Sequence, residues 1–108
     1  MWLAAALAGD ELAGVATACL FFTIEAGGFA ELQDLYVRPG NRNRGIARSL
    51  IESAAQWSLS REAERLEVVI TPEGQQQHDL DGFYVKQGFE RTGRTILTRS
   101  LGGVVTEA

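Results

Sequence analysis

A strand, a glycine-containing loop and an amphipathic helix follow one another between residues 32 and 60, and this unit limits the chain to folds that combine strands with helices. Leu32 to Val37 is apolar and extended in character, and Pro39-Gly40 ends it. From residue 46 onwards, apolar side chains recur with the period of a helix. They are Ile46, Ala47, Leu50, Ile51, Ala54 and Trp57. The spacing predicts a helix over residues 44–60.

The loop before this helix has the chemistry of an anion site. The first turn of a helix has N–H groups without an internal partner, and the helix dipole adds positive potential there. Gly45 keeps side-chain atoms away from this turn, and Arg42, Arg44 and Arg48 add positive charge. We interpret the loop as a cradle for pyrophosphate, with a merely solvated basic turn as the alternative. Neither G-x-x-x-x-G-K-[ST] nor G-x-G-x-x-G occurs, which argues against a nucleotide triphosphatase or a dinucleotide enzyme.

Length and composition exclude several classes of protein. At 108 residues the chain is long enough for one domain with one core. The net charge of -4 argues against a nucleic-acid partner, which would need a basic surface. No apolar run can span a membrane, and Met1 to Ala8 lacks the basic residue that begins a signal peptide. Cys19 is the only cysteine, so we expect a buried thiol and a cytoplasmic location.

Apolar runs and turn residues predict the remaining elements. We expect strands over residues 2–8, 12–24, 30–37, 66–71, 89–94 and 95–101. A second helix is expected over residues 75–87, closed by Gly88, and the tail from Gly102 should fray. The order β-β-β-α-β-α-β-β predicts an α/β fold in which helices pack on a mixed sheet.

Two motifs, in this order, resemble those of the GNAT superfamily of acetyl-CoA-dependent N-acetyltransferases. Residues 35–39, LYVRP, and residues 42–47, RNRGIA, match the family's strand and its [Q/R]-x-x-G-x-[G/A] loop. Residues 83–89, FYVKQGF, are similar to the family's F-Y-x-x-x-G-F helix ending. The resemblance covers about residues 2–101, so we expect residues 1–108 to form a single GNAT-like acetyltransferase domain.

The resemblance implies a role for each matching residue, and it implies no metal. Backbone groups of Leu35, Tyr36 and Val37 would bind the pantetheine arm of acetyl-CoA, the cosubstrate, as an added strand does. Tyr84 would be the catalytic acid that protonates the departing thiolate. Gln77 stands where the family often has an asparagine and would also contact the cofactor. The pyrophosphate would be held by Arg42, Asn43, Arg44, Gly45, Ile46, Ala47 and Arg48.

The implied reaction is direct attack on acetyl-CoA by a neutral primary amine of a small molecule or peptide. The group that removes the proton of this amine stays open. Small-amine acetyltransferases carry a glutamate where this chain has Gln33, and strand alternation should put Asp34 on the opposite face. Glu31 acting through a water, or His78, are the other choices. A non-catalytic acyl-CoA-binding or partner-assembly module with a degenerate GNAT fold is the alternative function.

The N-terminus departs from the family, whose members begin with a strand and two helices that this chain lacks. We therefore expect a homodimer or higher oligomer to cover apolar side chains on the N-terminal strands, with a truncated start as the alternative. The side chains concerned are Trp2, Leu3, Leu7, Val15, Leu20, Phe21 and Phe22.

Overall fold

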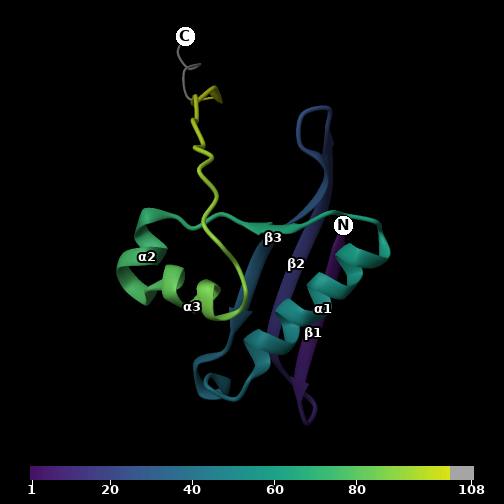
Figure 1. Ribbon diagram of the computed structural model, residues 1–108. Helices are drawn as coiled ribbons and strands as arrows, with labels where there is room; N and C mark the ends of the chain where they lie inside the picture. The colour runs from purple at the N-terminus through teal and green to yellow at the C-terminus, as the bar shows by residue number, and fades with distance from the viewer. Residues whose placement is uncertain (103–108) are drawn as a thin grey trace.

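The computed structural model describes residues 1–102, and it forms a mixed four-stranded sheet with helices on one side (Figure 1). The sheet order is β1-β2-β3-β4; the first three strands pair antiparallel, and β4 runs parallel to β3. The elements in chain order are β1 (Trp2–Ala8), β2 (Glu11–Thr23), β3 (Gly27–Val37), the short 3-10 helix η1 (Pro39–Asn41), α1 (Ile46–Ser60), β4 (Leu66–Val68), α2 (Pro72–His78) and α3 (Leu80–Lys86). The α/β class and the mixed sheet predicted from the sequence are confirmed.

The core lies between α1 and one face of the sheet. The helical face predicted from the sequence supplies Leu50, Ile51 and Ala54, which are buried against Ala16 of β2 and Leu32 of β3. Burying each large aliphatic side chain contributes about 1.5–3 kcal/mol. The core therefore fixes α1, and the loop that precedes it, against the three antiparallel strands.

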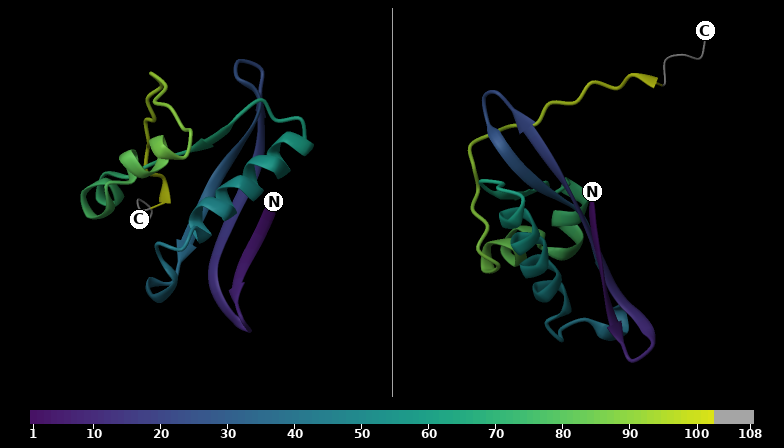
Figure 2. Two further views of the ribbon diagram at one scale, coloured as in Figure 1. Left: turned by 60° about the horizontal axis from the view of Figure 1, so that its bottom comes forward. Right: turned by 90° about the vertical axis from the view of Figure 1, so that its right-hand side faces the viewer.

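The opposite face of the sheet carries no helix in the described part of the chain (Figure 2, right). In β1 the alternation of a strand turns Leu3 and Leu7 to this face, where they are 60% and 65% exposed. Phe22 near the end of β2 is also exposed. The sequence prediction that N-terminal apolar side chains lack cover is thus confirmed for these residues. Trp2 is different, because its ring stacks on Trp57 of α1 with centroids 6.0 Å apart.

The C-terminal segment departs from the prediction. The two strands expected over 89–94 and 95–101 are wrong: these residues form no strand, and the last part of the segment runs away from the sheet (Figures 1 and 2). The expected strand 66–71 forms only as β4, which ends at Val68. A three-residue strand offers little edge to pair with, and a two-stranded ribbon alone is marginal in water. The fraying expected beyond Gly102 falls on residues 103–108, outside the described residues.

The helices begin and end differently from the expected bounds. The first starts at Ile46 instead of residue 44, because Asn43 and Gly45 both adopt positive φ angles, 63° and 81°. The second predicted helix, 75–87, is interrupted at Asp79, where φ is 48°, and becomes α2 and α3. Gly88 closes α3 with φ of 96°, as expected. Within residues 1–102, no helix is both long and apolar enough to cross a bilayer.

Candidate active site

A gap opens between β3 and β4, and it exposes the backbone of the segment expected to bind the cofactor. The two strands pair only where Ala30–Leu32 meets Leu66–Val68. Beyond Leu32, β3 has no neighbouring strand on this side within residues 1–102. Leu35, Tyr36 and Val37 pair with β2 on one side only, so their edge can accept an extended ligand.

The arginine loop is fastened to the end of β3. Arg42 donates from Nε to the carbonyl oxygen of Val37 at 2.9 Å. Its guanidinium carbon also lies 5.9 Å from the centre of the Tyr36 ring. Arg42 therefore fixes the loop in place, whereas the side chains of Arg44 and Arg48 are exposed to solvent.

The first turn of α1 has the features of an anion site. Its N-cap residue is Gly45, which offers no side chain to the free N–H groups, and its first turn contains no acidic residue. A Cβ atom built on Gly45 would meet nothing within 4 Å, so the space above the turn is open. Residues 46–48 therefore present backbone N–H groups and the positive end of the dipole to open space, which fits a pyrophosphate.

Gly14 of β2 lets the start of α1 lie close to the cofactor segment of β3. A Cβ atom at Gly14 would lie 2.9 Å from the carbonyl oxygen of Tyr36, closer than such atoms approach in proteins. It would also lie 3.2 Å from Ile46 Cγ2 and 3.3 Å from Leu50 Cδ1. The absence of a side chain at this one position thus permits the contact between helix, strand and loop.

Tyr84 of α3 reaches the same core from the other side of the gap. Its side chain is 7% exposed and belongs to the buried cluster with Leu32 and Leu50. The rings of Phe83 and Phe89 meet it edge to face, with centroids 5.1 and 5.3 Å away. Burial raises the pKa of the Tyr84 phenol above its ordinary value of 10.0, so this group keeps its proton at neutral pH. Among the side chains that the structure describes, none forms a hydrogen bond with its hydroxyl.

A β-bulge changes which side chains lie on the open face of β3. The register runs from Thr17 opposite Asp34 to Ala18 opposite Leu32, so Gln33 is an extra residue in β3. The bulge reverses the alternation, and Asp34 joins Gln33 on the face away from α1. The Thr17 hydroxyl donates to Asp34 Oδ2 at 2.6 Å. The expectation that Asp34 lies on the opposite face from Gln33 is therefore wrong.

Three more polar side chains form a chain of contacts on this face. Gln33 donates from Nε2 to Glu31 Oε1 at 3.1 Å. Its own carbonyl oxygen lies 3.4 Å from Sγ of Cys19. Cys19 is half-buried, not buried as the sequence suggested, because the face it lies on is uncovered. Glu31 and Asp34 thus place two carboxylates on the open face, close to the point where β3 and β4 separate.

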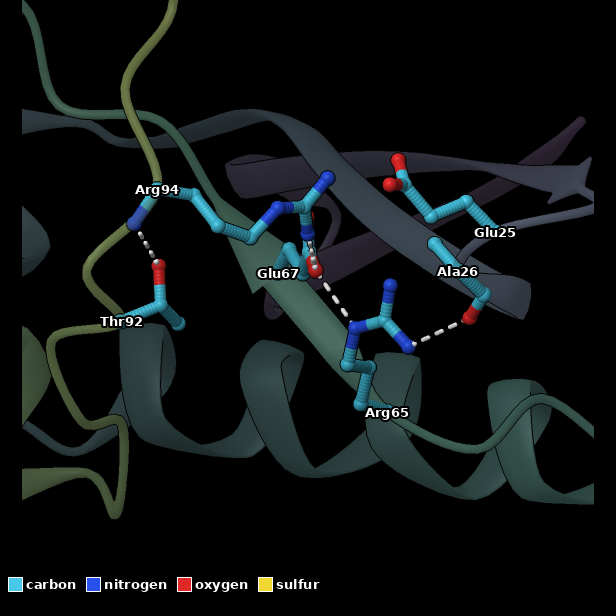
Figure 3. A pocket seen from close by; sticks show the side chains of 6 residues that line it. All are labelled: Glu25, Ala26, Arg65, Glu67, Thr92 and Arg94. Carbon is cyan, nitrogen blue, oxygen red and sulfur yellow. Dashed lines mark hydrogen bonds and ion pairs between the residues drawn. The ribbon is translucent and has the colours of Figure 1, made fainter.

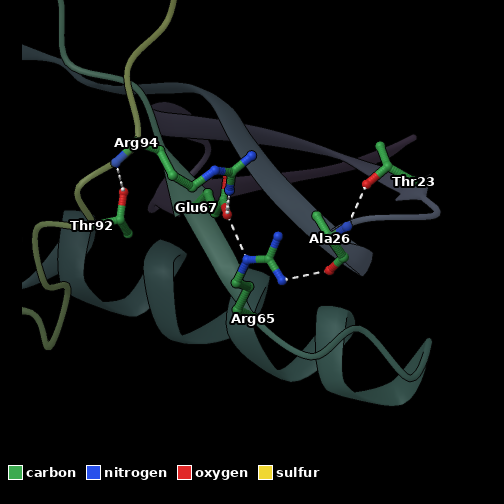
Figure 4. A network of polar contacts seen from close by, with 6 residues as sticks. All are labelled: Thr23, Ala26, Arg65, Glu67, Thr92 and Arg94. Atoms are coloured by element: carbon green, nitrogen blue, oxygen red, sulfur yellow. Dashed lines mark hydrogen bonds and ion pairs between the residues drawn. The ribbon is translucent and has the colours of Figure 1, made fainter.

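A pocket of about 390 Å³, which the sequence analysis did not predict, includes Glu67, the residue of β4 that pairs with Glu31 (Figure 3). At its base, Glu67 Oε2 accepts from Arg65 Nε at 2.6 Å and from Arg94 Nη1 at 2.8 Å (Figure 4). Arg94 and Glu67 are 27 residues apart, so no local pattern could have joined them. The lining residues are Glu25, Ala26, Arg65, Glu67, Thr92 and Arg94.

The structure thus brings most of the expected residues together. The cofactor segment 35–37 and the loop with the first helical turn, 42–48, are continuous around the end of β3. The side chains of Gln77 and His78 lie outside the described part of the structure, and the roles expected for them stay predictions. Among the described residues, no group of three or more acidic, histidine or cysteine side chains could hold a metal ion.

Solved structures share the fold. An integron cassette protein from the mobile metagenome of V. cholerae is 22% identical, with a TM-score of 0.81, over 94% of this chain and 61% of that chain. Another, from the mobile metagenome of Cole Harbour Salt Marsh, is 25% identical, with a TM-score of 0.76, over 92% and 59% of the two chains. Aminoglycoside N-acetyltransferase AAC(6')-Iy in complex with CoA is 24% identical, with a TM-score of 0.77, over 90% and 73%. The chain thus spans about three fifths of the length of the first two structures.

The sequence itself supports a family assignment. No curated protein matches it. The model of the acetyltransferase (GNAT) family, however, matches residues 1–89, a range that includes the cofactor segment, the arginine loop and Tyr84. Because this match extends over most of the chain, the protein belongs to the acetyltransferase (GNAT) family.

Proposed function

We propose that residues 1–108 form one N-acetyltransferase domain, which uses acetyl-CoA to acetylate a primary amine of a small molecule or peptide. The observation that carries the proposal is the continuous path from the free edge of β3 to the uncapped start of α1. Such a path suits an extended pantetheine arm followed by a pyrophosphate. Support also comes from AAC(6')-Iy, which has been solved with CoA and with a bisubstrate analog that joins CoA to acetylneamine.

The residues of the chain would divide the work between binding and proton transfer. Leu35, Tyr36 and Val37 bind the pantetheine arm through their backbone, and a backbone N–H in this segment polarises the carbonyl under attack. The first turn of α1 and the arginine loop hold the pyrophosphate. Acetyl-CoA supplies an acyl group already activated as a thioester. Tyr84, protonated at neutral pH, gives its proton to the sulfur as the carbon–sulfur bond breaks.

The amine must lose a proton as its nitrogen forms the new bond to the acetyl carbon. An alkylamine with an ordinary pKa near 10.4 is charged at neutral pH, so a base close to the gap is required. Glu31 and Asp34 are the carboxylates on the open face of β3, and we assign the base to this pair. Proton acceptor and proton donor then lie on opposite sides of the sheet, with the reacting carbon between them.

The cosubstrate can be tested without knowing the amine. Acetyl-CoA at about a hundred times its dissociation constant should stabilise the protein by roughly 2.7 kcal/mol. At roughly 4–8 °C per kcal/mol for a domain of this size, the unfolding midpoint should rise by about 10–20 °C. Adenosine diphosphate, which lacks the pantetheine arm, serves as the control and should act more weakly. A folded sample whose midpoint ignores acetyl-CoA would rule out the proposed cosubstrate.

A non-catalytic acyl-CoA-binding or partner-assembly module is the second candidate. The side chain at the family's usual base position is the amide of Gln33, which is occupied by contacts with Glu31 and Cys19. Release of free CoA thiol, followed across a broad panel of amines, separates the two functions. Turnover that Tyr84→Phe suppresses supports the enzyme, whereas cofactor binding without any turnover supports the module.

We further propose that the chain works as a homo-oligomer in the cytoplasm. The exposed side chains of Leu3 and Leu7 lie on a sheet face without a helical cover, and such apolar surfaces are commonly interfaces. Light scattering after size exclusion measures the mass in solution. Replacing both leucines by serine should yield a monomer, and a wild-type monomer would contradict the proposal.

A further inference from the structure

Two guanidinium groups from distant parts of the chain meet at one carboxylate beside the β3–β4 gap. Arg65 directly precedes β4, and Arg94 lies in the C-terminal segment. Both donate to the same oxygen of Glu67 (Figure 4). Two guanidinium groups share one carboxylate at this wall of the pocket, so each keeps N–H donors that Glu67 does not use.

Arg65 is fixed in position before any ligand arrives. Besides its bond to Glu67, it donates from Nη1 to the carbonyl oxygen of Ala26 at 2.9 Å. Its guanidinium carbon lies 4.7 Å from the centre of the Phe29 ring, within the range of a cation–π contact. Because these contacts already order the side chain, a ligand that binds Arg65 loses little free energy in ordering it.

The guanidinium nitrogens that do not bind Glu67 or Ala26 are available to an anion. Figure 3 shows the third nitrogen of Arg65 and the outer nitrogen of Arg94 pointing toward the side of the pocket where Glu25 lies. Planar guanidinium groups match the geometry of a carboxylate, and such charge-assisted hydrogen bonds are strong. The carboxylate of Glu25 gives the pocket a negative side as well. Among the side chains that line the pocket, the two arginines are therefore the groups that can bind a carboxylate.

The pocket lies on the face from which an amine would approach. Leu66 and Val68 pack against the core, so Glu67 between them points to the face away from α1. Glu67 is level with Glu31, one residue before the strands part. Glu31 and Leu35 pair with Cys19 and Ala16 of β2, which are three positions apart, so the two residues lie about 10 Å apart at roughly 3.3 Å per residue. An amine that reaches the cofactor segment from this pocket must therefore lie several bonds from the group bound by the arginines.

We propose that Arg65 and Arg94 bind a carboxylate of the acceptor, so that the amine acetylated belongs to an amino acid or peptide in which several bonds separate amine from carboxylate. The side-chain amine of a lysine-like amino acid and the terminal amine of a short peptide both meet this description. The inference rests on the proposed acetyltransferase function and adds the class of the acceptor.

Two acceptors of equal chain length provide the test. Aminohexanoate and hexylamine share the amine and the alkyl chain, and they differ in the terminal carboxylate. We expect kcat/KM for aminohexanoate to exceed that for hexylamine by about tenfold or more. This is the effect expected from one or two hydrogen bonds between the arginines and a charged carboxylate. Arg94→Gln should lower this ratio by about tenfold. Arg94 is 58% exposed, so the substitution should not disturb folding.

Arg91→Gln is the matched control, because Arg91 belongs to the same exposed segment but pairs with Asp81, outside the pocket. It should leave the ratio unchanged. Turnover of both amines without a preference for aminohexanoate would overturn the inference and leave the proposed function standing. So would a preference that Arg91→Gln and Arg94→Gln reduce equally.

A binding measurement separates the two proposals if no turnover is found. In ¹⁵N-labelled protein with CoA, aminohexanoate should shift the Nε–H signal of Arg65, assigned with Arg65→Lys, and hexylamine should not. A selective shift without turnover supports the carboxylate site and counts against the enzyme. No shift with aminohexanoate at millimolar concentration contradicts the carboxylate site, whatever the result for turnover.

Discussion

The contact at Gly14 makes a prediction whose size follows from the structure. In Gly14→Ala, the new Cβ would lie 2.9 Å from the backbone oxygen of Tyr36, and 3.2 and 3.3 Å from atoms of Ile46 and Leu50. A backbone oxygen in a paired strand cannot move aside as a side chain can. Overpacking of this kind costs about 1–3 kcal/mol. At roughly 4–8 °C per kcal/mol, the unfolding midpoint should fall by about 5–20 °C.

The same strain should reach the cofactor site. It can be relieved only by moving the Tyr36 carbonyl or the start of α1, and both belong to the proposed acetyl-CoA site. Thermal unfolding without ligand measures the loss of stability, and calorimetric titration with acetyl-CoA measures the affinity of the folded variant. We expect Gly14→Ala to lower both, although residue 14 itself contacts no cofactor in the proposed complex.

Gly40→Ala is the control for this experiment. A Cβ atom at Gly40 would meet nothing within 4 Å, and its φ is not positive. That substitution should be neutral, or it should stabilise the protein by about 0.4–1 kcal/mol, because alanine lowers the conformational entropy of the unfolded chain. If Gly14→Ala and Gly40→Ala unfold within about 2 °C of each other, the close approach of α1 to the strands is not as described.

Four further predictions concern the proposed chemistry. Tyr84→Phe should slow acetyl transfer by about a hundredfold while acetyl-CoA binding stays near that of the wild type; an unchanged rate would remove Tyr84 from the reaction. Because burial raises the Tyr84 pKa, this phenol should stay protonated above pH 10.0, and the stability it confers should be lost as pH rises from there, as an ultraviolet difference titration against Tyr84→Phe can show. Either Glu31→Gln or Asp34→Asn should reduce kcat by about a hundredfold; if neither does, the base lies elsewhere. Gly45→Ala should destabilise the free protein by about 1 kcal/mol, because φ is 81° there, and it should weaken acetyl-CoA binding, as calorimetry would detect.

The sequence was sufficient where the signal is local. Apolar alternation and helical period predicted β1, β2, β3 and α1 to within a few residues, because each of these elements buries one face against the others. The arginine loop was readable for the same reason, since its glycine and arginines stand together between a strand and a helix. The proposed cofactor half of the site is therefore visible in an unbroken stretch of the chain.

The proposed acceptor half could not be predicted from the sequence, because it depends on geometry that has no local pattern. The extra residue at Gln33 moves the residues that follow it in β3 to the opposite faces of the sheet. No residue type around Gln33 indicates a bulge. The pocket joins Arg65 and Glu67 to Arg94, which comes from a segment that the apolar pattern assigned to a strand. A strand over residues 89–94 would need the edge of another strand to pair with. Because β4 is only three residues long, it offers little of such an edge.

The bulge and the gap together would allow one sheet to serve both of the proposed proton transfers. Tyr84 is buried on the side covered by helices, where desolvation raises its pKa and would keep its proton in place until the proposed thiolate forms. Asp34 and Glu31 lie on the open side, where solvent can take away the proton removed from an amine. A regular pairing of β3 with β4 would separate the two sides by continuous backbone. Because the strands part after Leu32, a thioester lying between them can be reached from both sides at once.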